Sequence, residues 1–278
     1  MYYIQPHYHG ISRTTDDYER MAQAGVVAVG EPSFWAGFDR HYPQTFLDYF
    51  RQISEFEPTR AAQYGIRHYC WIAVNPKESE NLSISREVMA AMPDFLDKPT
   101  VLGIGEISLN KNTRNELTIF REQMEMAIRR HELVLIHTPH LRDKLKGTML
   151  TLDLLRELRA DPARVWIDHV EEHTIKAVLD GGYWAGMTLY PQTKMSPRRA
   201  ADMLEVYGVS RLLVNSSADW GPSSPFTLQE CAMEYRRRGH TEQELIEIFH
   251  NNPARFLGQN PKFDICPIRI GYEAIAAS

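Results

Sequence analysis

The chain has few cysteines, no long apolar run and no strong charge of either sign. Its three cysteines, Cys70, Cys231 and Cys266, are far apart and include no Cys-x-x-Cys pair, which argues against a disulfide framework and favours a reduced compartment. The net charge of −5 gives no global attraction to nucleic acid, although local basic patches stay open. These features indicate an ordinary water-soluble protein.

The sequence also lacks the marks of membrane insertion and export. No apolar run approaches the roughly 18 residues that a membrane helix needs. The first residues show neither a charged segment nor an apolar segment of the signal-peptide type, and a cleaved leader would remove His7 and His9. We therefore expect a cytoplasmic protein without a membrane partner.

What the chain does have is a regular alternation of strand and helix patterns. With 278 residues and 43% hydrophobic content it can bury one large core. Eight segments read as strands: 2–4, 26–29, 67–74, 101–106, 134–137, 165–169, 184–187 and 212–215. Helical patterns separate most of them, at 15–24, 45–64, 86–92, 115–131, 149–158, 172–179 and 196–207, and Thr227/Glu230 and Thr241/Glu244 have capping-box spacing for two more. The pattern predicts a single-domain α/β protein, a (β/α)₈ TIM barrel over residues 1–260 with a C-terminal tail at 261–278.

A doubly wound open sheet is the rival fold. A dinucleotide-binding version of that fold would carry a glycine-rich phosphate loop after its first strand. No such loop follows the first strand here, so the barrel is favoured.

Polar side chains gather where the predicted strands end. Residues i and i+2 of a strand point to the same side, so His7 and His9 can direct two imidazoles at one point. In a barrel the carboxyl ends of all strands meet on one face. The residues at these ends are His7, His9, Glu106, His137 and His169, with Asp219 just beyond the last strand. Each alone could be a packed histidine or a capping acid, but together they indicate a metal site.

The ordered set of motifs resembles the TatD-type metal-dependent hydrolases of the amidohydrolase superfamily, over nearly the whole chain up to about Gly258. The motifs are His7-Tyr-His9, Gly105-Glu-Ile-Ser-Leu-Asn110, Ile136-His-Thr138, Asp168-His169, Asp219 and Asn252-Pro-Ala-Arg-Phe-Leu257. The resemblance implies a site for two divalent metal ions. His7, His9 and Asp219 would bind one ion, His137 and His169 the other, and Glu106 would bridge them.

Imidazoles with carboxylates favour zinc, and manganese, iron or magnesium are the alternatives. No lysine stands at a strand end in the bridging position, which argues against the carbamylated-lysine branch of the superfamily. Paired cations activate a water molecule and polarise the bond that it attacks. Asp219 would orient that water, accept its proton and return it to the leaving group, and Glu106 is the second residue assigned to catalysis.

The chain departs from the family pattern where substrate would be held. Gln5 stands where the family has Asp, Asn110 ends the glutamate motif, and Pro139 and His140 replace the usual Arg after the His137 motif. Asp219 also lies further from the last strand than the family's Asp. These departures put the family's DNase activity in doubt more than its metals.

Five residues are candidates for substrate contact. Arg142 follows the His137 strand with Lys144 and Lys146 and could bind phosphate, His140 and His173 could contact substrate or move protons, and Trp35 and Trp220 could stack on a planar group. For each, an ordinary loop position is the alternative.

The sequence therefore predicts a metal-dependent hydrolase acting on a phosphoester or another small ester, amide or lactone, with a small molecule as its partner. A TatD-like DNase or 3′–5′ exonuclease is the rival within the enzyme class. A metal-holding barrel without catalytic activity, used for binding, is the rival outside it.

Overall fold

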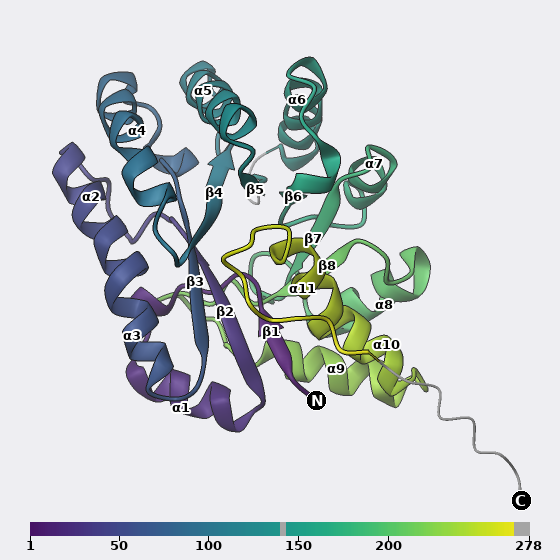
Figure 1. Ribbon diagram of the computed structural model, residues 1–278. Helices are drawn as coiled ribbons and strands as arrows, with labels where there is room; N and C mark the ends of the chain where they lie inside the picture. The colour runs from purple at the N-terminus through teal and green to yellow at the C-terminus, as the bar shows by residue number, and fades with distance from the viewer. Residues whose placement is uncertain (140–142, 270–278) are drawn as a thin grey trace, which may run out of the picture.

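Eight parallel strands form one sheet in the order β1 to β8, so each strand pairs with its neighbour in the sequence. A computed structural model describes residues 1–139 and 143–269. The strands are β1 Tyr3–Gln5, β2 Val26–Pro32, β3 Arg67–Ile72, β4 Val101–Ser108, β5 Leu133–His137, β6 Val165–Ile167, β7 Trp184–Thr188 and β8 Leu212–Asn215. The predicted (β/α)₈ barrel is confirmed (Figure 1).

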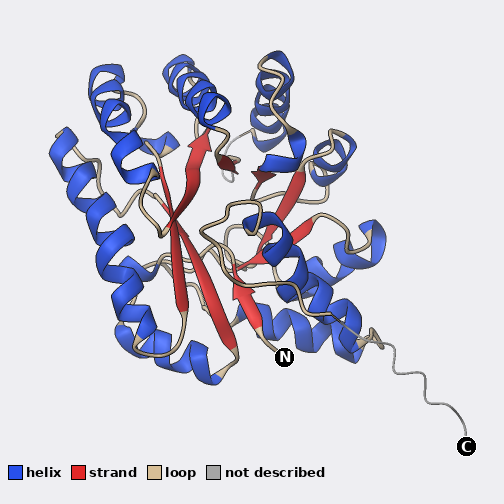
Figure 2. Cartoon of the chain, viewed as in Figure 1, coloured by secondary structure: helices blue, strands red, loops and turns tan. Residues whose placement is uncertain are grey.

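Most of the helices surround the sheet on its outer side, and the last one lies across one end of the barrel (Figure 2). The helices are α1 Thr15–Gln23, α2 Pro43–Arg51, α3 Glu57–Ala62, α4 Leu82–Leu96, α5 Arg114–Arg130, α6 Lys144–Glu157, α7 Ile175–Asp180, α8 Pro197–Tyr207, α9 Thr227–Arg237, α10 Glu242–Ile246 and α11 Asn252–Leu257. Within the described ranges, no helix combines the length and the apolar content of a membrane span.

The barrel closes where β1 and β8 run out. Tyr8 and Ala218 form a parallel bridge, and the amide of His9 donates to the carbonyl of Ala218 at 3.0 Å. Below this bridge, Gln5 donates from Nε2 to Ser216 Oγ at 2.9 Å and accepts from the Ser216 amide at 3.0 Å. Gln5, which stands where the family has Asp, thus links β1 to the residue that directly follows β8.

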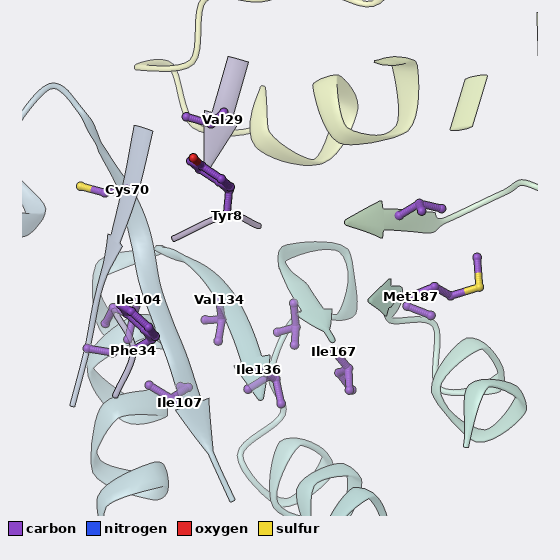
Figure 3. Packing of buried hydrophobic residues seen from close by; sticks show 14 of the residues in the cluster. Tyr8, Val29, Phe34, Cys70, Ile104, Ile107, Val134, Ile136, Ile167 and Met187 are labelled. Atoms are coloured by element: carbon purple, nitrogen blue, oxygen red, sulfur yellow. The ribbon is translucent and has the colours of Figure 1, made fainter. Parts of the chain in front are cut away.

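Buried apolar side chains form two clusters, one on each side of the strands. The larger cluster lies between strands and helices and includes Val29, Ile104, Val134 and Ile167 (Figure 3). The smaller one fills the barrel and includes Ile4, Ala28, Tyr69, Trp71, Leu102, Leu133, Leu135, Trp166, Leu213 and, from α11 and the segment after it, Phe256 and Phe263.

Part of the predicted tail belongs to this inner cluster. The Phe263 ring lies 4.8 Å from that of Tyr69, centroid to centroid. Asn260 also donates to the Leu102 carbonyl at 2.9 Å. The first part of the tail, up to Asp264, therefore covers the amino-terminal end of the barrel.

Helix boundaries differ from the prediction at several places. The helix predicted over residues 45–64 runs as α2, a π-helical turn at Gln52–Phe56 and α3, and Pro58 lies in the first turn of α3. The capping box at Thr241/Glu244 is present, but the one at Thr227/Glu230 is wrong, because Phe226 precedes the first residue of α9 and Thr227 lies inside the helix. α4 and α6 are longer than the predicted 86–92 and 149–158.

Candidate metal centre

The predicted histidines and Glu106 meet at the carboxyl ends of β1, β4, β5 and β6. His7 and His9 follow β1, His137 is the last residue of β5, and His169 lies two residues beyond β6. Glu106 lies in β4, where the pairing with β5 is irregular between Gly105 and Ile107. An irregularity of this kind changes the direction of one side chain relative to its neighbours.

One oxygen of Glu106 is the centre of the cluster. Oε1 lies 3.2 Å from His169 Nε2, 3.4 Å from His7 Nε2 and 3.5 Å from His137 Nδ1. His9 adds its Nε2 atom 3.0 Å from Nε2 of His7. All five side chains are buried. Four imidazoles and one carboxylate thus form a buried cluster at the mouth of the barrel.

A second layer of polar groups holds two of these imidazoles in place. His7 Nδ1 lies 2.6 Å from Asp168 Oδ2, and His169 Nδ1 lies 2.6 Å from Thr188 Oγ1. Thr188 and Asn215 both donate to Asp168 Oδ1, at 3.2 and 2.9 Å. The network assigns the ring protons of His7 and His169 to Nδ1, which leaves the Nε2 lone pairs directed at Glu106, as a metal ligand requires.

Burial sets the charge states of the cluster. It lowers the pKa of His9 and of His169 well below the usual histidine value, and it also lowers that of His137. Burial alone would raise the pKa of Glu106, but its interactions with His7, His137 and His169 hold that pKa well below its usual range. Neutral imidazoles at His9, His137 and His169 beside an ionised carboxylate form a donor set that fits zinc, manganese or iron.

Asp219 lies on the wall of the same pocket, apart from this donor set. Its Oδ1 accepts from the Tyr190 hydroxyl at 3.0 Å and from the Gly221 amide at 2.7 Å. Ser217 is the residue of this loop that reaches the cluster, with Oγ 3.3 Å from His7 Nε2. Ser217 has φ 44° and His169 has φ 61°, left-handed backbone that is uncommon outside glycine and concentrates at functional sites.

The pocket over the cluster contains two of the five substrate candidates. Trp35 and Trp220 line it, with their rings 6.2 Å apart, centroid to centroid. His173 is exposed in the turn before α7 and is not among the lining residues. His140 and Arg142 lie outside the described residues.

Lys144, which was named beside Arg142 as a residue that could bind phosphate, does not line the pocket. It is buried behind the site, where Nζ donates to the His169 carbonyl at 2.6 Å. Lys144 therefore supports the backbone of a predicted ligand from outside the pocket.

The sequence predicted no role for several polar residues of the site, although Asp168 belongs to one of the quoted motifs. They are Asn75, Lys77, Asp168, Thr188, Lys194 and Ser217. Asn75, Asp168 and Thr188 stand at or just past strand ends, so inspection of every strand end for any polar residue would have found them. Lys77 and Lys194 lie in loops without a comparable signal.

A second buried group of potential ligands lies on the outer side of β2 and β3. His68 Nε2 lies 2.7 Å from Glu31 Oε2, and Glu57 accepts from Tyr18 at 2.9 Å and from Arg60 Nη2 at 2.6 Å. Since both carboxylates already have close partners, we interpret this group as a structural network.

Comparisons with known proteins place the chain in a family. The family model described as TatD related DNase matches residues 16–258. A metal-dependent hydrolase of Methanocaldococcus jannaschii, itself uncharacterised, is 25% identical over 260 residues, which cover 91% of this chain and 98% of that one.

Solved structures of similar fold include a TatD-like protein and a more distant homologue. The TatD-like protein of Archaeoglobus fulgidus superposes with a TM-score of 0.76 at 26% identity, over 92% of this chain and 100% of that one. The phosphotriesterase homology protein of Escherichia coli, solved with phosphate in its active site, shares the fold, with a TM-score of 0.66 at 16% identity over 92% and 98% of the two chains. The family model spans most of the barrel, and the chain belongs to the TatD-related DNase family of metal-dependent hydrolases.

Proposed function

We propose that this chain hydrolyses a small ester bond, with a phosphoester as the first choice and a carboxylic ester, lactone or amide as alternatives, at a centre of two divalent metal ions. The observation that carries the proposal is the convergence of His7, His137 and His169 on one oxygen of Glu106 within 3.5 Å. His9 and Asp219 are the further ligands that we propose, and zinc is the metal we expect first.

Bound divalent ions supply a nucleophile from water at neutral pH and polarise the substrate oxygen. The chain contributes orientation and proton transfer. Asp168 and Thr188 fix the rings of His7 and His169, and Asn75 fixes Glu106 through a hydrogen bond of 3.2 Å from Nδ2 to Oε2.

Asp219 is the residue we propose to move the proton. It lines the pocket within reach of substrate and stands beside Tyr190. Burial and the neighbouring Asp219 raise the pKa of Tyr190 to about 12, so Tyr190 stays protonated and donates to the carboxylate. A carboxylate held in this way can accept a proton from the attacking water and pass it to the leaving group.

Metal content per chain tests the centre. Elemental analysis of wild-type protein beside Glu106→Gln should find about two transition-metal ions in the wild type and far fewer in the variant. Wild-type protein that stays empty after zinc or manganese is supplied would contradict the metal mechanism.

A panel of phosphomonoesters, phosphodiesters, carboxylic esters and lactones tests the reaction. Asp219→Asn should keep the metal but lose turnover by orders of magnitude, since it removes the proton acceptor. Turnover near that of the wild type would exclude Asp219 from this role. Metal-loaded protein that hydrolyses nothing in the panel would favour the non-catalytic barrel.

A nuclease is the second candidate, and the match to the DNase family model favours it. Cleavage of single-stranded DNA should then depend steeply on salt, because phosphate contacts release counterions. The net charge of −5 argues against it.

A further inference from the structure

Two lysines face the pocket and form no ion pair in the described part of the chain. The pocket lies between the loops that follow β1, β2, β3, β7 and β8, and both Lys77 and Lys194 line it. Lys194 Nζ has a long contact to Ser217 Oγ, at 3.5 Å, and lies 5.2 Å from the centre of the Tyr190 ring, while Lys77 Nζ lies 4.5 Å from the centre of the Trp35 ring. Among the described residues no carboxylate oxygen lies within 4.0 Å of either ammonium group, although both side chains are partly buried.

The backbone holds both lysines in fixed places. Lys77 lies in a 3₁₀ turn after β3, and its amide donates at 3.1 Å to Asn75 Oδ1, while the amide group of Asn75 donates to Glu106. In the loop after β7, the Lys194 amide donates to the Tyr190 carbonyl at 2.8 Å, and its own carbonyl accepts from Arg199 at 2.6 Å. Asn75 thus holds both Lys77 and Glu106, and Lys194 is held by hydrogen bonds within the loop after β7 and to α8.

The charges of the pocket lining are balanced only while no metal is bound. The charges of Lys77 and Lys194 cancel those of Glu106 and Asp219, and the imidazoles add none if neutral. When the ionised Asp168 behind the ligands is counted as well, one divalent ion leaves one excess positive charge and the two proposed ions leave three. A low-dielectric pocket of this kind attracts an anion strongly.

The size and walls of the pocket limit what the anion is attached to. The free volume is about 80 Å³, enough for one small functional group above the metal cluster. At the mouth, the rings of Trp35 and Trp220 are inclined by 60° to each other, and Trp220 is 56% exposed. Because the two indole rings do not stack on each other, a planar substituent of the ligand can stack on one of their faces.

We propose that Lys194 and Lys77 form an anion-binding subsite, which selects small substrates that carry a carboxylate or phosphate group on a planar body flanked by Trp35 and Trp220. The proposal rests on the proposed hydrolase function, because it places the subsite next to that metal centre. The subsite itself is a property of binding, so it can be tested without turnover.

The experiment is calorimetric titration of metal-loaded protein with phenyl phosphate, benzoate and the neutral benzyl alcohol. We expect at least one of the two anions to bind at least tenfold more tightly than benzyl alcohol, and the tighter anion identifies the group selected. Lys194→Met and Lys77→Met should each weaken that anion ten- to a hundredfold, the range for loss of a charge-assisted hydrogen bond, and leave benzyl alcohol unchanged. Lys176→Met, which changes an exposed lysine on α7, is the matched control and should bind like the wild type.

A second arm separates the lysines from the metal. After chelation, the preferred anion should still bind more weakly to Lys194→Met than to the wild type. Equal binding by the three probes, or loss of anion binding on chelation with no effect of either lysine in the loaded protein, would overturn the subsite. Neither result depends on whether the protein hydrolyses any substrate.

Discussion

At the residue scale, Asp168 joins the ligands to the barrel wall. It binds His7 directly and receives hydrogen bonds from Thr188 and Asn215, which lie on β7 and β8. Although burial opposes its charge, interactions with His169 and His7 hold the pKa of Asp168 below its usual range. Asp168 is therefore ionised at neutral pH and can accept a hydrogen bond from the Nδ1–H group of His7.

We expect Asp168→Asn to weaken zinc binding ten- to a hundredfold, the usual effect of removing a group that orients a metal ligand. Competition with a chromophoric chelator measures this affinity. Asp48→Asn, at an exposed position on α2, is the control. Unchanged affinity in Asp168→Asn would show that His7 needs no carboxylate partner.

The cysteines give a prediction that is independent of the site. Burial raises the pKa of the Cys231 thiol to about 12 and raises that of Cys70 as well, whereas Cys266 is exposed. Because the thiolate is the reactive form, a disulfide thiol probe at pH 8 should react rapidly with one cysteine per native chain and with all three after denaturation. Rapid reaction of more than one native thiol would mean that the core opens around Cys70 or Cys231.

The histidines could be predicted from sequence, while much of their surroundings could not. His7, His137 and His169 follow apolar strands, and the geometry of a parallel barrel brings such positions together. Ser217 and Lys194 reach the pocket through loop conformations, including the left-handed backbone of Ser217, which no periodic pattern encodes.

At the element scale, the amino terminus of α5 stabilises the loop that follows β4. Thr113 Oγ1 accepts from the Glu116 amide at 3.1 Å, and the Glu116 carboxylate accepts from the amides of Asn110, Lys111 and Thr113. This capping box satisfies amides that the helix leaves without partners.

Thr113→Ala should lower the free energy of unfolding by about 1 kcal/mol, the typical loss for an N-cap threonine. Urea denaturation followed by circular dichroism measures it. Thr118→Ala, in the same helix but away from the cap, should change stability by less, since alanine is the better helix former. Equal losses in the two variants would contradict the role of the cap.

Helix ends were harder to predict than helix positions. α4 begins at Leu82 because the side chain of Asn81 accepts from the Ile84 amide, and it continues through Pro93 to Leu96. Local propensity predicts a shorter helix, but Phe95 and Leu96 pack into the core and keep the last turn helical.

At the scale of the whole molecule, the barrel depends on side chains that cover its amino-terminal end, and the strand pattern of the sequence does not predict them. Phe263, 7% exposed, covers the base of the barrel together with Phe256. Phe263→Ala should lower the free energy of unfolding by about 3 kcal/mol, the lower end of the range for a buried phenylalanine. Urea denaturation tests this, with Phe38→Ala at an exposed loop position as the control, and a loss below that of the control would show that the base closes without Phe263.

The charge of the whole chain separates the two candidate activities. A nuclease that contacts six to ten phosphates loses about 10³- to 10⁵-fold in affinity between 50 and 200 mM salt. This chain carries a net charge of −5 and concentrates its pocket cations at Lys77 and Lys194, which can meet only one or two anionic groups. We therefore expect a single-stranded oligonucleotide, followed by fluorescence anisotropy, to bind weakly at 50 mM salt and to lose less than tenfold in affinity at 200 mM. Tight binding with a steep loss would reveal a phosphate-binding surface beyond this pocket and would make the nuclease the better assignment.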